Sequence, residues 1–100
     1  MRKKVTMKIL HLTLKKQWFE MIASGEKTEE YREIKPYWNT RLLGKKYDAI
    51  NFRNGYSKNA PTMLIELSRV RCGIGYTEWG APATAEVFIL ELGAILTHNA

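Results

Sequence analysis

The sequence predicts a single α+β domain built on a curled sheet or small β-barrel of about five to six strands with two short helices. A chain of 100 residues has the size of one compact domain and is too short for two cores. Its 45% hydrophobic and 26% charged residues exclude a disordered chain, a collagen and a coiled coil. The predicted elements follow the order strand, helix, strand, short helix and three strands, which favours the α+β class. We expect residues 1–100 to form this domain, with residues 1–4 as a loose basic tail.

The first strand and the first helix follow from the spacing of apolar residues. Residues 5–14 predict a half-buried strand because leucines alternate with polar residues from position 10 onward. Residues 15–24 predict a helix with Trp18 and Ile22 on its apolar face. Thr13 is the expected N-cap, and Gly25 is expected to end the helix.

The next predicted strand, residues 27–34, has no apolar face. Glu30 and Arg32 fall on one side, and Lys27 and Glu29 fall on the other. A strand in a small domain is expected to turn one apolar face to the core, so here one side lines a polar cleft or faces water. The alternative is an edge strand whose charges discourage aggregation.

The rest of the chain predicts one short helix, three strands and two loops. Pro36 opens the short helix, which Gly44 closes. The remaining predicted segments are strands at 47–53, 62–71 and 86–96, and loops at 54–61 and 72–83.

Positive charge gathers in the first part of the chain. Residues 1–60 contain 14 of the 16 Lys and Arg residues but 6 of the 10 acidic residues, a net charge of +8. The other residues have a net charge of −2. A basic surface of this kind attracts nucleic acid, although a soluble basic protein with a solvated tail fits the same asymmetry.

Several classes of protein are disfavoured by what the sequence lacks. No apolar run approaches the roughly 18–20 residues that cross a bilayer, so we expect no membrane association. A single cysteine, Cys72, excludes an internal disulfide and favours the cytoplasm. The histidines His11 and His98 show no ligand spacing with Cys72, so we expect no metal, and no motif predicts a cofactor.

The charged strand also carries a family signature. Its pattern Gly25-x-Lys27-x-x-Glu30-x-Arg32 resembles the G-x-K-x-x-E-x-R signature of the ASCH domain, a family of PUA-like β-barrels. The similarity extends over nearly the whole chain after about Lys8, including the preceding strand and helix. It implies a PUA-like barrel with a cleft, lined by these charged residues, that recognises RNA or a modified nucleobase.

The side chains suit that chemistry. Glu30 and Arg32 are two positions apart on a strand, so they share a face and can pair. A carboxylate held by a guanidinium stays ionised and can accept from the exocyclic amine of cytosine or adenine. Lys27 would offer a point charge to a phosphate or a polarised carbonyl, and Tyr31 is expected to pack on the opposite side.

Two further groups of residues are candidates for ligand binding. Lys15 and Lys16 are expected in the first turn of the first helix, where a bound anion would relieve their conflict with the helix dipole, although solvated lysines are the alternative. Asn54, Tyr56 and Lys58 lie in a loop where the aromatic ring can stack on a base, although Asn-Gly is also a plain turn signal.

The second loop supplies one more aromatic residue and one more acid. Trp79 either stacks on a base or covers the end of the barrel, and we assign Trp18 and Trp38 to the core. If the chain is an amidohydrolase like some members of that family, Glu78 would stand in for their distant catalytic acid.

Two other functions remain open. Some relatives of the ASCH domain are amidohydrolases for N4-acetylcytidine, and ribonuclease activity is also attributed to the family. Lys27, Glu30 and Glu78 would then be the catalytic residues, but Glu30 stands where the amidohydrolases carry a threonine. A further hypothesis is that the charged strand pairs with a partner protein and that no nucleic acid is bound.

Overall fold

The structure is a computed structural model that describes residues 6–99, so the expected tail at 1–4 lies outside the described residues. Its elements, in chain order, are β1 (Ile9–Leu14), α1 (Lys16–Ala23), β2 (Glu29–Glu33), α2 (Pro36–Leu42), β3 (Ala49–Asn54), β4 (Thr62–Gly73), the 3-10 turn η1 (Thr77–Trp79) and β5 (Val87–Asn99).

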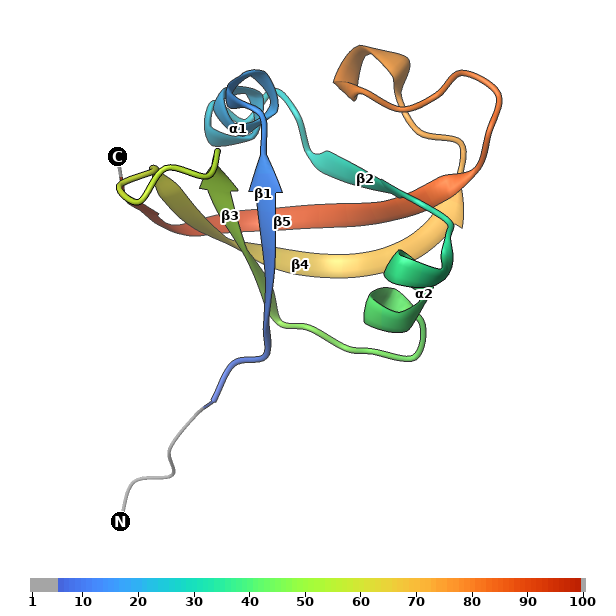
Figure 1. Cartoon of the computed structure of the whole chain (residues 1–100), viewed down its shortest axis with the longest axis horizontal. Helices are drawn as coiled ribbons and strands as arrows, with labels where there is room; N and C mark the ends of the chain where they lie inside the picture. The colour runs from blue at the N-terminus through green and yellow to red at the C-terminus, as the bar shows by residue number, and fades with distance from the viewer. Residues whose placement is uncertain (1–5, 100) are drawn as a thin grey trace.

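The five strands form one mixed sheet in the order β1-β3-β4-β5-β2. β1 and β3 are parallel, and the other neighbouring strands are antiparallel. The sheet curls into a half-barrel along the long strands β4 and β5, with α1 at one end and α2 at the other (Figure 1). The predicted α+β class and the two helices are confirmed.

The concave side of the half-barrel contains the core. On β1 the alternation places Leu10, Leu12 and Leu14 inward, each at most 7% exposed. Phe52 of β3 and Met63 of β4 are register partners and are fully buried. The core is therefore built from the alternating apolar positions that the sequence shows.

The curling of the sheet brings its two edges, β1 and β2, close together. Arg32 of β2 donates a hydrogen bond from Nη2 to the backbone carbonyl of Thr13 in β1, at 3.3 Å. We call this line between the two edge strands the seam. Because α1 joins β1 to β2, one end of the seam is also the N-terminal end of α1 (Figure 1).

Several predicted boundaries are wrong by a few residues. β1 begins at Ile9, and residues 6–8, which were predicted to belong to this strand, are irregular. Because β1 runs to Leu14, the N-cap of α1 is Lys15 and not Thr13. β2 begins only at Glu29 because the backbone N–H of Lys27 still bonds to the carbonyl of Met21 in α1, at 3.0 Å.

Candidate functional site: a charged cleft at the seam

Lys27 is the most deeply buried charged residue of the site. The residue is 1% exposed, and its ammonium group lies between β2 and η1. Nζ donates to the backbone carbonyls of Glu29 and Trp79, at 2.5 and 2.9 Å. It also forms an ion pair with Oε1 of Glu30 at 3.2 Å. Lys27 thus connects the start of β2 to the loop that contains η1.

Two aromatic rings complete the surroundings of this ammonium group. Nζ of Lys27 lies 4.7 Å from the ring centroid of Tyr31 and 5.4 Å from that of Trp18. Burial lowers the pKa of Lys27 from its ordinary value, and the nearby carboxylate of Glu30 opposes that change. The expected contact between Lys27 and a phosphate finds no support here, because the side chain exposes no surface.

Glu30 shares its carboxylate between two cations. Its second oxygen, Oε2, pairs with Nη2 of Arg32 at 2.7 Å, while Oε1 faces Lys27. The guanidinium of Arg32 lies 5.0 Å from the ring centroid of Trp38, and its Nε is buried without a hydrogen-bond partner. The predicted lateral pair on one face of the strand is therefore present, and Glu30 is held by both Lys27 and Arg32.

A cleft of about 510 Å³ opens over Glu30 at the end of the seam. Its walls come from the end of β1, from α1, from β2 and from the loop after β3. The lining residues are Thr13, Leu14, Lys15, Trp18, Glu30, Tyr31, Arg32, Gly55 and Tyr56. Charged residues of β2, Lys15 and the aromatic ring of Tyr56 thus meet in one place, although they are up to 41 positions apart in the chain.

The other predicted ligand-binding residues do not line this cleft. Lys16 is exposed and pairs with Glu20 at 3.4 Å. Asn54 uses its backbone N–H to bond to the carbonyl of Pro61, at 2.9 Å, and Lys58 lies exposed further along the same loop.

The two candidates from the second loop are also outside the cleft. Trp79 contributes its backbone carbonyl to Lys27, and its ring meets Tyr76 edge-on at 4.9 Å. Glu78 is exposed on η1, and its carboxylate lies 3.5 Å from the hydroxyl of Thr77. No carboxylate of this loop therefore faces Glu30 across the cleft.

Trp18 and Tyr31 line the cleft although neither was expected there. Trp18 packs against the core, as predicted, but both it and Tyr31 are half-buried and also line the cleft. The close approach of Gly80 explains the position of Trp18, since a Cβ at residue 80 would lie 3.0 Å from its ring. Trp38 also packs against the core, as predicted, and its half-buried ring lies beside the guanidinium of Arg32.

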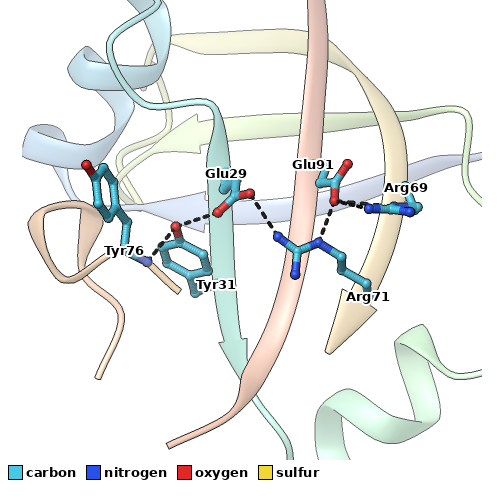
Figure 2. A network of polar contacts seen from close by, with 6 residues as sticks. All are labelled: Glu29, Tyr31, Arg69, Arg71, Tyr76 and Glu91. Carbon is cyan, nitrogen blue, oxygen red and sulfur yellow. Dashed lines mark hydrogen bonds and ion pairs between the residues drawn. The ribbon is translucent and has the colours of Figure 1, made fainter. Parts of the chain in front are cut away.

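Tyr31 is held in place by a chain of polar contacts on the other side of β2. Its hydroxyl donates to Oε1 of Glu29 at 2.7 Å and accepts from the backbone N–H of Tyr76 at 3.0 Å (Figure 2). Burial, together with the neighbouring Glu29 carboxylate, raises the pKa of Tyr31 to about 12. The phenol is therefore a protonated donor at neutral pH.

The same chain of contacts continues across β5 to β4. Oε2 of Glu29 pairs with Arg71 at 3.3 Å, and Arg71 pairs in turn with Glu91 at 2.6 Å (Figure 2). Arg69 completes the chain, 2.9 Å from the same Glu91 oxygen. The hydrogen bonds from Arg69 and Arg71 lower the pKa of Glu91, and the bond to Glu91 raises that of Arg71. We call these six residues of Figure 2 the clasp, because they link β2, β5, β4 and the η1 loop.

The described residues include neither a cluster that could hold a metal ion nor a helix that could cross a membrane. Among residues 6–99, no group of three or more His, Cys, Asp or Glu side chains is placed to hold a metal ion. No helix in this part of the chain combines the length and apolarity needed to cross a bilayer. Comparison with protein-family models, with curated proteins and with solved structures finds no match.

Proposed function

We propose that this protein is a PUA-like, ASCH-like module that binds RNA or a modified nucleobase in the cleft at the seam. The observation that carries the proposal is the carboxylate of Glu30, which is 7% exposed and flanked by Lys27 and Arg32 at the cleft. The two cationic partners satisfy part of the hydrogen-bonding capacity of this buried carboxylate and fix its position at the cleft.

The geometry leaves Glu30 able to accept from a ligand. An ionised carboxylate has about four lone-pair sites on its two oxygens. Two of them are used, one by Lys27 and one by Arg32. The remaining sites suit a donor such as the exocyclic amine of cytosine or adenine, and they disfavour a base that presents a carbonyl oxygen there.

The rim of the cleft supplies stacking and charge. Tyr56 is 87% exposed, so its aromatic ring is available to a ligand. A base stacked on such a ring gains about 1–3 kcal/mol. Lys15 is exposed on the same rim and is able to contact a phosphate or sugar of the same ligand.

In this account Lys27 is a positioning residue. Its three acceptors lie within the protein, so it fixes the carboxylate of Glu30 rather than touching the ligand itself. Arg32 fixes the same carboxylate from the other side and remains partly exposed to the cleft.

The hydrolase and ribonuclease alternatives have weaker support in this geometry. An acid–base mechanism needs two groups within reach of one substrate. Glu30 lines the cleft, but Lys27 has no exposed surface, and Glu78 is not among the lining residues. The protein-interaction alternative has one observation in its favour, which is that β2 is an edge strand of the sheet.

The test is a titration of the folded protein with cytidine, N4-acetylcytidine, adenosine and uridine. Binding is monitored through the NMR chemical shifts of the backbone amides. We expect cytidine or adenosine to shift the amides of β2 and of the Gly55–Tyr56 turn, and uridine to bind at least tenfold more weakly. The Glu30→Gln variant should lose this preference.

The matched control is Glu33→Gln, because Glu33 is an exposed carboxylate of the same strand and does not line this cleft. It should bind like the wild type. Equal affinity for all four nucleosides would overturn the binding proposal. Release of acetate from N4-acetylcytidine would also overturn it and would favour the hydrolase instead.

A further inference from the structure

A second hollow lies directly beside the proposed base-binding cleft. It has a volume of about 790 Å³ and shares two lining residues, Tyr31 and Arg32, with the cleft. We call it the second hollow. Its far wall comes from α2 and from the loop before β5, so it lies along β2 on the other side of Arg32.

The walls of the second hollow combine apolar surface with two carboxylates. Ile34, Trp38, Pro82 and Ala85 supply the apolar part, and Ile34 is 46% exposed. Glu33 and Glu86 also line the hollow. Carboxylates repel a phosphate, so an uncharged planar group with N–H donors suits this site better than an anion.

Arg32 lies where the two sites meet. Its Nη2 bonds to Glu30 and to the carbonyl of Thr13, while Nη1 has no hydrogen-bond partner among residues 6–99. The guanidinium therefore offers one unused end of a fixed positive charge at the boundary. A phosphate that joins two nucleosides is a matching anion for this position.

We propose that the second hollow binds the base next to the one held by Glu30, so that the ligand is a segment of single-stranded RNA rather than a free nucleoside. This inference rests on the proposed function of the cleft and names its substrate class. One base lies over Glu30, the linking phosphate faces Nη1 of Arg32, and the adjacent base lies against Trp38 and Pro82.

The test compares ligands of increasing length by isothermal titration calorimetry. The probes are cytidine, cytidine 3′-monophosphate, and the dinucleotides CpU and UpC. We expect one of the two dinucleotides to bind at least tenfold more tightly than cytidine 3′-monophosphate, because only the dinucleotide fills the second hollow.

The Ala85→Trp variant places a bulky side chain in the second hollow at an exposed loop position. It should reduce the affinity for the dinucleotide to that of cytidine 3′-monophosphate and leave cytidine binding unchanged. The matched control is Ala83→Trp, since Ala83 is exposed in the same loop but does not line the hollow. It should leave all affinities unchanged.

The outcomes separate this inference from the proposed function. If cytidine binds but neither dinucleotide binds better than the monophosphate, or if Ala85→Trp has no effect, the second hollow is not a base site and the first cleft stands alone. If the wild type binds none of the probes, the proposed function fails and this inference fails with it.

Discussion

At the scale of single residues, the least expected side chain is Lys27. A buried ammonium group is costly unless its hydrogen bonds are satisfied, and here two carbonyls and the Glu30 carboxylate satisfy it. The sequence motif predicted this lysine as a site residue, but its place in the sequence could not show that its side chain would be enclosed. Its contacts suggest that it holds the site together.

Replacing this buried cation should therefore cost stability. In Lys27→Met, the carbonyls of Glu29 and Trp79 lose a donor and Glu30 retains only Arg32. We expect the free energy of unfolding to fall by about 3 kcal/mol, measured by urea denaturation. Lys16→Met, which removes an exposed lysine, is the control and should change it by about 0.5 kcal/mol or less. Equal stability of the two variants would mean that the buried pair contributes nothing.

Tyr31 should make the stability of the protein depend on alkaline pH. Its pKa is raised to about 12 in the folded state, against 10.0 ordinarily, so the folded chain keeps this proton where the unfolded chain has lost it. This contribution is fully present below pH 10 and is lost as the pH rises toward 12. Tyr31→Phe should show a shallower loss of stability between these pH values.

The readout is the free energy of unfolding in urea at pH 9, 10 and 11. Tyr37→Phe provides the comparison, because Tyr37 is 53% exposed and lies outside the clasp. It should keep the wild-type pH dependence. A wild-type slope in Tyr31→Phe would show that this phenol is not responsible.

At the scale of elements, β2 shows how one strand serves two purposes. It is an edge strand that pairs only with β5, which agrees with the interpretation that its charges protect an edge. Alternation along the strand separates these charges into two sets. Glu30 and Arg32 lie at the cleft, while Glu29 belongs to the clasp on the other side. Tyr31 belongs to both, because its side chain lines the cleft and its hydroxyl bonds to Glu29.

The η1 loop should be sensitive to any side chain at Gly75. A Cβ there would lie 2.6 Å from the ring of Tyr31 and 2.7 Å from Cβ of Ala81. We expect Gly75→Ala to lower the free energy of unfolding by about 1–3 kcal/mol and to weaken ligand binding, because Tyr31 lines the cleft. Urea denaturation and the nucleoside titration measure both effects. Thr77→Ala, at an exposed position of the same loop, should change neither.

The elements were more predictable than the site. Alternation of leucines on β1 and the glycine after α1 determine local structure, so both were found from the sequence to within a few residues. The motif similarly indicated Glu30 and Arg32. The sequence did not predict that Trp18 and Tyr31 line the cleft or that Trp38 lies beside Arg32, because these positions depend on contacts between distant segments of the curled sheet.

At the scale of the whole molecule, the half-barrel brings its two edge strands near each other and puts the candidate site between them. The side chain of Arg32 bridges these edges by its hydrogen bond to Thr13, so the site lies on the open side of the half-barrel. β1, α1 and β2 form most of the cleft, and its accessible cations are Lys15, which is exposed, and Arg32, which is partly exposed. These two side chains are the groups at the cleft that can attract the phosphates of an anionic polymer.

The affinity for RNA should consequently depend on salt. For a short single-stranded oligonucleotide, log affinity should fall linearly with log salt concentration, and Lys15→Gln should reduce the slope by about 0.7 if Lys15 contacts one phosphate. Lys45→Gln is the control, because Lys45 lies away from the cleft and lines other surface hollows. It should leave the slope unchanged. The affinity is measured by fluorescence anisotropy at salt concentrations from about 50 to about 300 mM, and the slopes of the variants are compared with that of the wild type. A salt-independent affinity would exclude phosphate contacts.

The most direct test of the central claim is a crystal structure of the protein with the tighter-binding of the two dinucleotides, CpU or UpC. We predict that the exocyclic amine of the cytosine donates to the carboxylate of Glu30, with its ring against Tyr56. A cytosine bound outside the cleft, or one that turns its amine away from Glu30, would contradict the account.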